Sequence, residues 1–114
     1  MLKLRLDAKS TSGGFMYPVR IEWLPPDEGG RKSIPLGGKY YSVSRYPEDE
    51  AWQSNAWSVV CELKKKTVEG EIIVSYGTVG FLMDAAPKER MEKYDCFEIY
   101  EGPQKVANVF LLHQ

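Results

Sequence analysis

Apolar and polar residues alternate along much of the chain, and this period of two is typical of β-strands that bury one face. The clearest case is the segment 15–24, where one set of alternate positions is apolar or aromatic and the other carries Met16, Arg20 and Glu22. The apolar set is Tyr17, Val19, Ile21 and Trp23. Pro25 and Pro26 then end the predicted strand, because proline cannot donate to a sheet ladder.

Six further runs rich in β-branched and aromatic residues predict strands on the same grounds. They are 39–46, 58–63, 71–76, 79–83, 96–100 and 106–112. The three lysines at 64–66 are expected to end the second of these runs with charge. Gly77 and Gly80 predict a bulge or bend between 71–76 and 79–83. The segment 101–104 is expected to close a hairpin between the last two runs.

Only one part of the chain favours a helix. It is the segment 85–93, in which Pro87 is well placed for a first helical turn. Because this segment is short and poor in apolar residues, we expect at most one short helix near 86–93. Six or seven short strands with regular turns therefore predict an all-β domain, either a small closed barrel or a sandwich.

The first 14 residues have a pattern of their own. Residues 2–6 alternate leucine with a basic residue, and 10–14 read Ser-Thr-Ser-Gly-Gly, which is typical of a flexible loop. We therefore expect an extra N-terminal strand and loop over 1–14 and a single β domain over 15–114. A total of 114 residues suits one domain that needs no disulfide or metal to fold.

Composition narrows the possible partners and compartments. Fifteen basic and sixteen acidic residues give a formal charge of −1, so no overall attraction to nucleic acid or anionic lipid follows. Cys61 and Cys96 lie in apolar runs and are predicted to be buried free thiols. The N-terminus has no apolar core of a signal peptide and no run is long enough to span a membrane. We therefore expect a cytoplasmic protein with no membrane partner.

The residues that usually carry catalysis are scarce. His113 is the only histidine and the penultimate residue, which makes it a poor general base. The cysteine and histidine spacing does not suit zinc, and no Gly-rich phosphate-binding motif occurs. The acidic run at 48–50 is expected to be a solvated loop. The sequence thus predicts a protein that is not an enzyme and that has no metal, cofactor or bound nucleotide.

Two longer stretches carry a family resemblance. They are Leu-Pro-Pro-Asp-Glu-Gly-Gly-Arg-Lys-Ser-Ile-Pro-Leu-Gly-Gly-Lys-Tyr-Tyr at 24–41 and Tyr-Asp-Cys-Phe-Glu-Ile-Tyr-Glu-Gly-Pro-Gln-Lys-Val-Ala-Asn-Val-Phe-Leu-Leu-His at 94–113. The first resembles the start of the C-terminal β-barrel domain of elongation factor Tu and its stand-alone relatives, and the second resembles the closing hairpin of that domain. The resemblance implies a closed six- to seven-stranded antiparallel barrel.

In that family the barrel is a binding domain that touches aminoacyl-tRNA, the GTPase domain and the nucleotide exchange factor. By resemblance, Arg31 and Lys32 match one group of tRNA contacts, and Glu101 and Gly102 match another. The match is incomplete, since Lys32 stands where the family has a histidine and Pro103 replaces a glycine. The family's GTPase lies in another domain, so nucleotide binding is not expected here. Gly29 and Gly30 are expected to be structural, because paired glycines allow a tight turn.

Two classes of function follow. The first is a non-enzymatic interaction module that binds RNA, a translation-related protein or another protein, such as a toxin that it neutralises as an immunity protein. Trp52 and Trp57 are candidate interface anchors for it, or alternatively plugs for a barrel end. The second is a small-molecule-binding barrel or small enzyme with an aromatic-lined pocket at the barrel mouth. Its candidate residues are Tyr40, Tyr41, Arg45 and Tyr46. A filled barrel interior would favour the first class.

Overall fold

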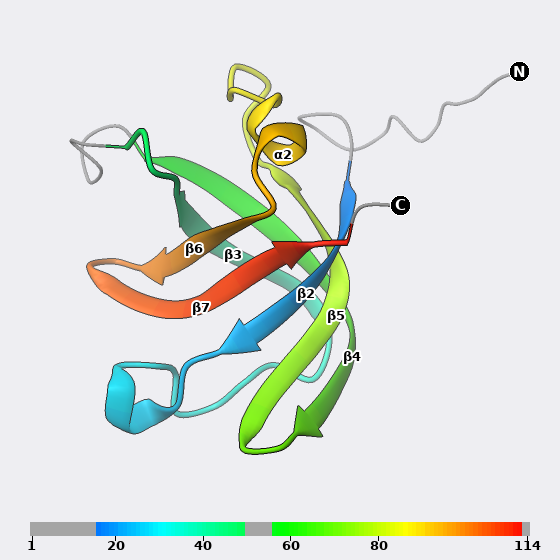
Figure 1. Ribbon diagram of the computed structural model, residues 1–114, viewed down its shortest axis with the longest axis vertical. Coiled ribbons are helices and arrows are strands. Elements are labelled where there is room, and N and C mark those ends of the chain that lie inside the picture. Colours follow the sequence, from blue (N-terminus) through cyan, green and yellow to red (C-terminus); the bar gives the residue numbers. More distant parts are fainter. Residues whose placement is uncertain (1–15, 50–55, 113–114) are drawn as a thin grey trace, which may run out of the picture.

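The computed structural model describes residues 16–49 and 56–112, which form a closed barrel of six antiparallel strands (Figure 1). The strands are β2 (Tyr17–Trp23), β3 (Gly38–Arg45), β4 (Trp57–Glu69), β5 (Ile72–Phe81), β6 (Cys96–Glu101) and β7 (Gln104–Leu111). Around the barrel they follow the order β2-β5-β4-β3-β6-β7, and β7 pairs with β2 to close it. The predicted all-β barrel is confirmed.

The alternation of apolar residues puts one face of each strand inside the barrel. The most deeply buried side chains are mostly β-branched, and aromatic rings join them in one continuous core. Those with no exposed surface include Val19, Ile21, Val59, Cys61, Val79, Ile99, Ala107 and Val109. Burying each large aliphatic side chain contributes roughly 1.5–3 kcal/mol. The barrel is therefore filled by its own side chains and does not enclose a channel.

β4 is longer than the sequence predicted. The lysines at 64–66 do not end it, because β4 continues to Glu69 and pairs with β5 as far as Ile72. A register shift between Leu63 and Lys65 lies opposite Gly77. A Cβ atom at Gly77 would lie 1.9 Å from the carbonyl oxygen of Glu62, so only glycine allows this close approach. The bulge falls on β4, and β5 is one continuous strand where two runs were expected.

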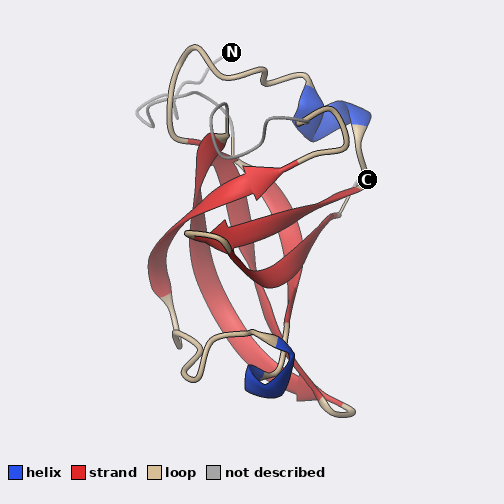
Figure 2. Cartoon of the chain, turned by 90° about the vertical axis from the view of Figure 1, so that its left-hand side faces the viewer, coloured by secondary structure: helices blue, strands red, loops and turns tan. Residues whose placement is uncertain are grey.

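The extra length of β4 carries its hairpin with β5 beyond the neighbouring strand. β3 begins at Gly38, opposite Leu63, so the residues of β4 after Leu63 have β5 on one side and no strand on the other. Figure 2 shows this hairpin projecting past the rest of the barrel. It forms a wall at the end of the barrel where β2 ends and β3 begins.

Two short helical segments lie at opposite ends of the barrel. A 3-10 turn, η1 (Pro26–Glu28), follows β2 and ends at Gly29. The helix predicted within 85–93 is reduced to α2 (Arg90–Lys93), because Pro87 starts a preceding turn in which its carbonyl accepts from the amide of Arg90 at 3.0 Å. We name the end that carries η1 the pocket end and the end that carries α2 the capped end.

The cysteines differ from each other. Cys61 is fully buried as predicted, and burial raises the pKa of its thiol to about 12. Cys96 is exposed, which corrects the prediction that it is buried, because it is the first residue of β6 and faces outward. The expected N-terminal strand and loop over 1–14, Trp52 and His113 lie outside the described residues. Within the described ranges no helix is long and apolar enough to cross a membrane.

Candidate binding site at one end of the barrel

The two turns singled out in the sequence meet at the pocket end. The guanidinium of Arg31 forms an ion pair with the carboxylate of Glu101, and the hydroxyl of Tyr40 donates to the same carboxylate. The side-chain amide of Gln104 donates to the carbonyl of Gly29. The structure therefore brings together Arg31 and Glu101, which are 70 positions apart in the sequence, and joins them to each other.

This contact shifts the pKa values of the three side chains. Burial opposes the charge on Glu101, but hydrogen bonds from Tyr40 and Arg31 outweigh it and lower the pKa of the carboxyl group. The hydrogen bond to Glu101 raises the pKa of Arg31, and burial together with Glu101 raises the pKa of Tyr40. The positive charge of Arg31 is thus already balanced by a carboxylate.

The bonds that join Arg31 and Tyr40 to Glu101 lie where the backbone pairing of β3 with β6 is incomplete. The ladder between β3 and β6 spans only three residue pairs, from Val43 with Tyr100 to Arg45 with Glu98. β6 extends only one residue further toward the pocket end, to Glu101, whereas β3 reaches Gly38, and Arg31 of the loop 24–37 contacts the end of β6 there. The bonds from Arg31 and Tyr40 to Glu101 connect this loop, β3 and the end of β6 where backbone pairing has stopped.

The backbone at the pocket end needs glycine at three positions, for different structural reasons. Gly29 takes a φ of 93° as it ends η1, and Gly102 takes a φ of 59° in the β6–β7 turn. Gly30 has an ordinary φ, but a Cβ there would lie 1.9 Å from the carbonyl oxygen of Leu24. Lys32, next along the loop, is exposed and forms no ion pair within the described ranges. The loop therefore holds its backbone tightly and presents Lys32 to solvent.

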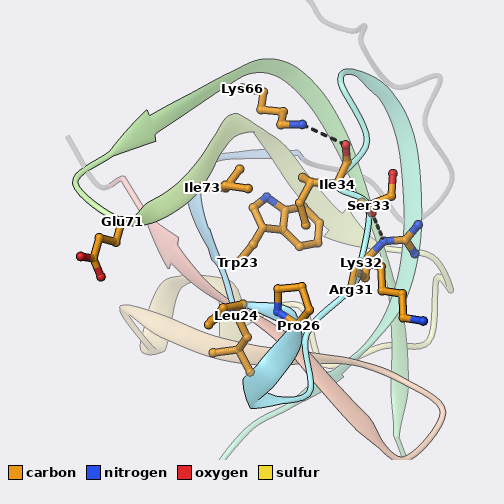
Figure 3. A pocket seen from close by; sticks show the side chains of 11 residues that line it. Trp23, Leu24, Pro26, Arg31, Lys32, Ser33, Ile34, Lys66, Glu71 and Ile73 are labelled. Carbon is orange, nitrogen blue, oxygen red and sulfur yellow. Dashed lines mark hydrogen bonds between the residues drawn. The ribbon is translucent and has the colours of Figure 1, made fainter.

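A pocket of about 450 Å³ lies between this loop and the projecting β4–β5 hairpin (Figure 3). Its lining is mainly apolar at the centre and charged at the rim. The lining residues are Trp23, Leu24, Pro25, Pro26, Arg31, Lys32, Ser33, Ile34, Lys66, Glu71 and Ile73. The indole of Trp23 forms the floor, donates to the Ser75 hydroxyl at 2.9 Å and meets the Tyr40 ring edge-on at 5.3 Å. This volume falls in the range of roughly 300–1,000 Å³ that is usual for ligand sites.

The rim of the pocket is more positive than the whole chain. Lys66 donates to the carbonyl of Ile34 at 3.3 Å, and no carboxylate of the described residues lies within ion-pair distance of its amine. Lys32 and Lys66 lie on opposite sides of the Trp23 indole in Figure 3. Glu71 also lines the pocket, but its carboxylate points away from the indole in that view. The pocket can therefore receive an apolar group that carries negative charge beside it.

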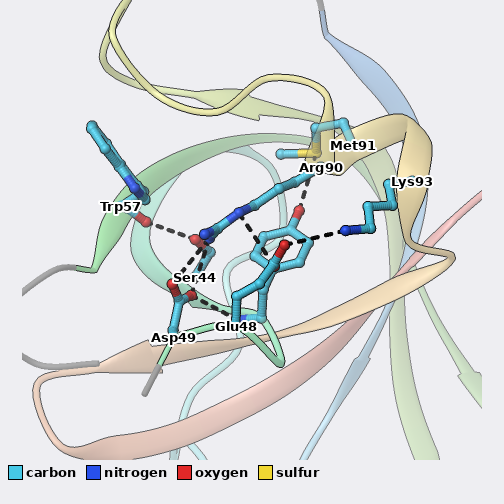
Figure 4. Close-up of polar contacts among 8 residues, drawn as sticks. Ser44, Glu48, Asp49, Trp57, Arg90, Met91 and Lys93 are labelled. Atoms are coloured by element: carbon cyan, nitrogen blue, oxygen red, sulfur yellow. Dashed lines mark hydrogen bonds and ion pairs between the residues drawn. The ribbon is translucent and has the colours of Figure 1, made fainter. Parts of the chain in front are cut away.

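The capped end is closed in a different way (Figure 4). Tyr46 is buried there and stacks on Phe97 at 4.9 Å, and its hydroxyl contacts the Met91 sulfur at 3.6 Å. Arg90 lies over the Tyr46 ring at 5.2 Å and contacts both carboxylate oxygens of Asp49 at 3.0 and 3.2 Å. Asp49 also accepts from the backbone amide of Tyr46 at 2.9 Å. This cluster plugs the barrel and compensates its own charges.

The four candidates for an aromatic-lined mouth do not converge on one site. Tyr40 is buried at the pocket end and Tyr46 at the capped end. Tyr41 is 56% exposed on the outer wall, and Arg45 lies there beside the Tyr100 hydroxyl at 3.4 Å. The small-molecule site expected from these residues is therefore not formed by them.

Of the two tryptophan candidates, only Trp57 lies in the described part of the chain. It is the first residue of β4, is half-buried and packs against the core, and its carbonyl accepts from the Ser44 hydroxyl at 2.8 Å. Sequence reasoning missed Trp23, Ile34 and Lys66 as a group, because Trp23 reads as an ordinary core residue and the lysine as the end of a strand. The Pro-Pro pair directly after Trp23 is the signal that the chain leaves the barrel there.

Neither a search for metal-binding groups among the described residues nor comparison with known proteins assigns a function to this site. Among residues 16–49 and 56–112, no group of three or more His, Cys, Asp or Glu side chains is arranged to hold a metal ion. A six-stranded barrel does not by itself identify a relative of the elongation factor Tu domain. Comparison of the chain with protein-family models, with curated proteins and with solved structures gives no match.

Proposed function

We propose that the chain is a non-enzymatic interaction module that binds a macromolecular partner at the pocket end of the barrel. The observation that carries this proposal is that basic side chains have carboxylate partners at the capped end, whereas two lysines at the pocket end have none among the described residues. At the capped end Arg90 and Lys93 face the carboxylates of Asp49 and Glu48. At the pocket end Lys32 and Lys66 surround an apolar pocket without a carboxylate partner among the described residues.

Two further features support a macromolecular partner. Leu36 is 78% exposed on the loop that borders the pocket, and Val68 is 66% exposed on the projecting hairpin. Exposed large apolar side chains close to one pocket are typical of a surface that a partner covers. The barrel interior is filled, and the buried hydroxyls of Ser75 and Ser44 bond to the Trp23 indole and to the Trp57 carbonyl.

The test is capture of partners from a lysate on immobilised protein, with and without RNase. The informative variant is Lys32→Glu, since this lysine is exposed and makes no contact that the fold needs. Lys88→Glu is the matched control, because it makes the same change of charge near the capped end. We avoid charge reversal at Arg31, since that would break its contact with Glu101.

The proposal expects at least one species that wild type and Lys88→Glu retain and that Lys32→Glu loses. Loss of that species after RNase would identify an RNA partner, and persistence would identify a protein. Equal retention by all three proteins would show that the pocket end is not the binding surface.

The pocket volume also supports a second candidate function, the binding of a small anionic molecule. Thermal unfolding with a series of small aromatic carboxylates would test it. An increase in melting temperature that Lys32→Glu and Lys66→Gln both reduce would favour this candidate. A macromolecule captured through the same lysines would leave the first proposal in place.

A further inference from the structure

The projecting part of β4 is a sheet edge next to the pocket. β3 pairs with β4 only up to Leu63, and no backbone hydrogen bond within the described residues reaches the other side of Lys64–Glu69. An open edge of this length offers unpaired amide and carbonyl groups to an extended segment.

The edge and the pocket share one face of the hairpin. Lys66 pairs with Ser75 across the two strands, and Val68 pairs with Ile73. Side chains of directly opposed residues lie on the same side of a sheet. Ser75 accepts from the indole of Trp23, so this side is the one that faces the pocket. A strand added to β4 would direct alternate side chains toward Trp23.

The charged side chains along the β4 edge determine which kind of extended segment can pair with it. Lys64, Lys65 and Lys66 follow one another along the edge. Lys64 lies 3.7 Å from the carboxylate of Glu62. The pKa of Glu69 is lowered mainly by Arg20 and to a smaller extent by the charge of Lys65, whereas no carboxylate of the described residues forms an ion pair with Lys66. Lysines on an open edge repel basic strands and discourage self-association, since a second copy would bring the same lysines. The same side chains attract an acidic strand.

We infer that the pocket end binds an extended, acidic segment of a partner protein, which adds as a strand to the β4 edge at Lys64–Val68 and inserts one apolar side chain over Trp23. This inference rests on the proposed function, because it names the partner of the same site. Backbone pairing supplies affinity that is independent of sequence, and the pocket and lysines supply the preference.

The pocket favours a protein segment over RNA for two reasons. Sequence-tolerant RNA binding uses exposed aromatic faces on which bases stack, whereas Trp23 and Tyr40 are only 3% and 7% exposed. A continuous polyanion crossing this end would also pass Asp27 and Glu28, both exposed on η1. A short segment with carboxylates placed beside the lysines avoids them.

The experiment uses a synthetic peptide, acetyl-Glu-Thr-Leu-Thr-Glu-Thr-amide, in which leucine and both glutamates share one face of a strand. Binding to the full chain is measured by calorimetry and by ¹⁵N NMR. The expected result is saturable binding with a shift of the Trp23 indole signal and slower solvent exchange of backbone amides in Lys64–Val68. Trp23→Phe assigns the indole signal.

Three controls give the expected losses. Replacing both glutamates by glutamine, replacing leucine by alanine, or testing Lys66→Glu should each weaken binding about tenfold or more, while Lys88→Glu should not change it. Lys66→Gln serves as the milder variant if Lys66→Glu perturbs the spectrum of the free protein. A peptide N-methylated at alternate amides, which cannot pair as a strand, should fail to bind.

The outcomes separate this inference from the proposed function. Equal binding of the neutral peptide, no change in the exchange of β4 amides, or no binding up to about 1 mM would overturn the inference. If the lysate partner is still lost with Lys32→Glu in that case, or proves sensitive to RNase, the proposed function survives with a different partner. If neither peptide nor partner depends on the pocket end, both fail.

Discussion

The two ends of this barrel are closed in different ways. The capped end is sealed by buried aromatic rings and by an Arg90–Asp49 ion pair whose two side chains are 13% and 4% exposed. At the pocket end the ladder between β3 and β6 is incomplete, and a loop held by Arg31 and Glu101 closes the gap. Closure by a loop leaves a pocket, whereas closure by packed rings does not.

The difference shows where binding capacity can arise in a small barrel. A filled interior provides stability and no site, because each interior position is taken by a core side chain. A site forms where the pairing of neighbouring strands stops short and where charged side chains are left without internal partners. Both conditions hold at the pocket end, and neither holds for the cluster around Tyr46.

The largest effect is expected from Asp49→Ala at the capped end. This change leaves Arg90 without its buried carboxylate and the Tyr46 amide without its acceptor. Breaking a buried ion pair on one side costs about 3–5 kcal/mol, so we expect the free energy of unfolding in urea to fall by that amount. Asp49→Asn, which keeps an acceptor for the amide, should lose less.

The same variant tests whether the ends are independent. NMR signals of the pocket end, including the Trp23 indole, should keep their positions in Asp49→Ala under folding conditions. Movement of those signals would mean that the capped end sets the shape of the pocket, and the contrast between the two ends would no longer hold.

The next effect is expected from Gly30→Ala at the pocket end. The added Cβ would lie 1.9 Å from the Leu24 carbonyl oxygen, so the backbone of the loop must move. Such overpacking costs up to about 3 kcal/mol, and NMR shifts should be confined to the loop and the pocket. Gly102→Ala is the comparison, because its Cβ meets open space and only its positive φ penalises it. An equal loss in both variants would contradict a role for close approach at Gly30.

A third prediction concerns two serines inside the barrel. Ser75 accepts from the Trp23 indole, whereas the Ser42 hydroxyl has no hydrogen-bond partner among the described residues. Ser75→Ala should destabilise the fold by about 1–2 kcal/mol, because the buried indole N–H loses its acceptor. Ser42→Ala should be neutral or slightly stabilising in the same urea titrations. The opposite order would show that the pocket floor does not depend on the Trp23–Ser75 bond.

The sequence was sufficient to predict the barrel but not the structure of its two ends. Alternation of residues such as Val19 and Ile21 follows directly from burial of one strand face, so the strands and the fold class could be predicted. The extension of β4 could not, because Lys64–Lys66 read as a strand end, and only pairing with β5 makes them part of the strand.

The candidate site was predicted in part. The resemblance drew attention to Arg31 and Glu101, but a motif does not tell whether two side chains are free for a ligand or bonded to each other. The pocket depends on where the loop after Trp23 returns to the barrel, and no local pattern determines that path. Cys96 shows the same limit, since an apolar neighbourhood in sequence did not place its side chain inside.

The smallest expected effect is a pH dependence at the pocket end. Hydrogen bonds from Tyr40 and Arg31 hold the pKa of Glu101 below its ordinary value despite partial burial. A carboxyl group with a lowered pKa in the folded state adds stability above its unfolded pKa, near 4.3, and that stability is lost as pH falls through the folded pKa. Because the Glu101 side chain is 38% exposed, solvent screening limits the contribution to less than about 1 kcal/mol.

Urea unfolding of wild type and Glu101→Gln at neutral and acidic pH measures this contribution. The difference in unfolding free energy between the two proteins should be present at pH 7 and shrink as pH falls through the lowered pKa of Glu101, where the carboxylate of wild type becomes protonated. Glu28→Gln, an exposed carboxylate on η1, is the control. If it shows the same pH dependence, the Arg31–Glu101 contact does not hold the loop, and closure of the pocket end must come from its other contacts, such as the Gln104–Gly29 hydrogen bond and the packing of Trp23 and Ile34.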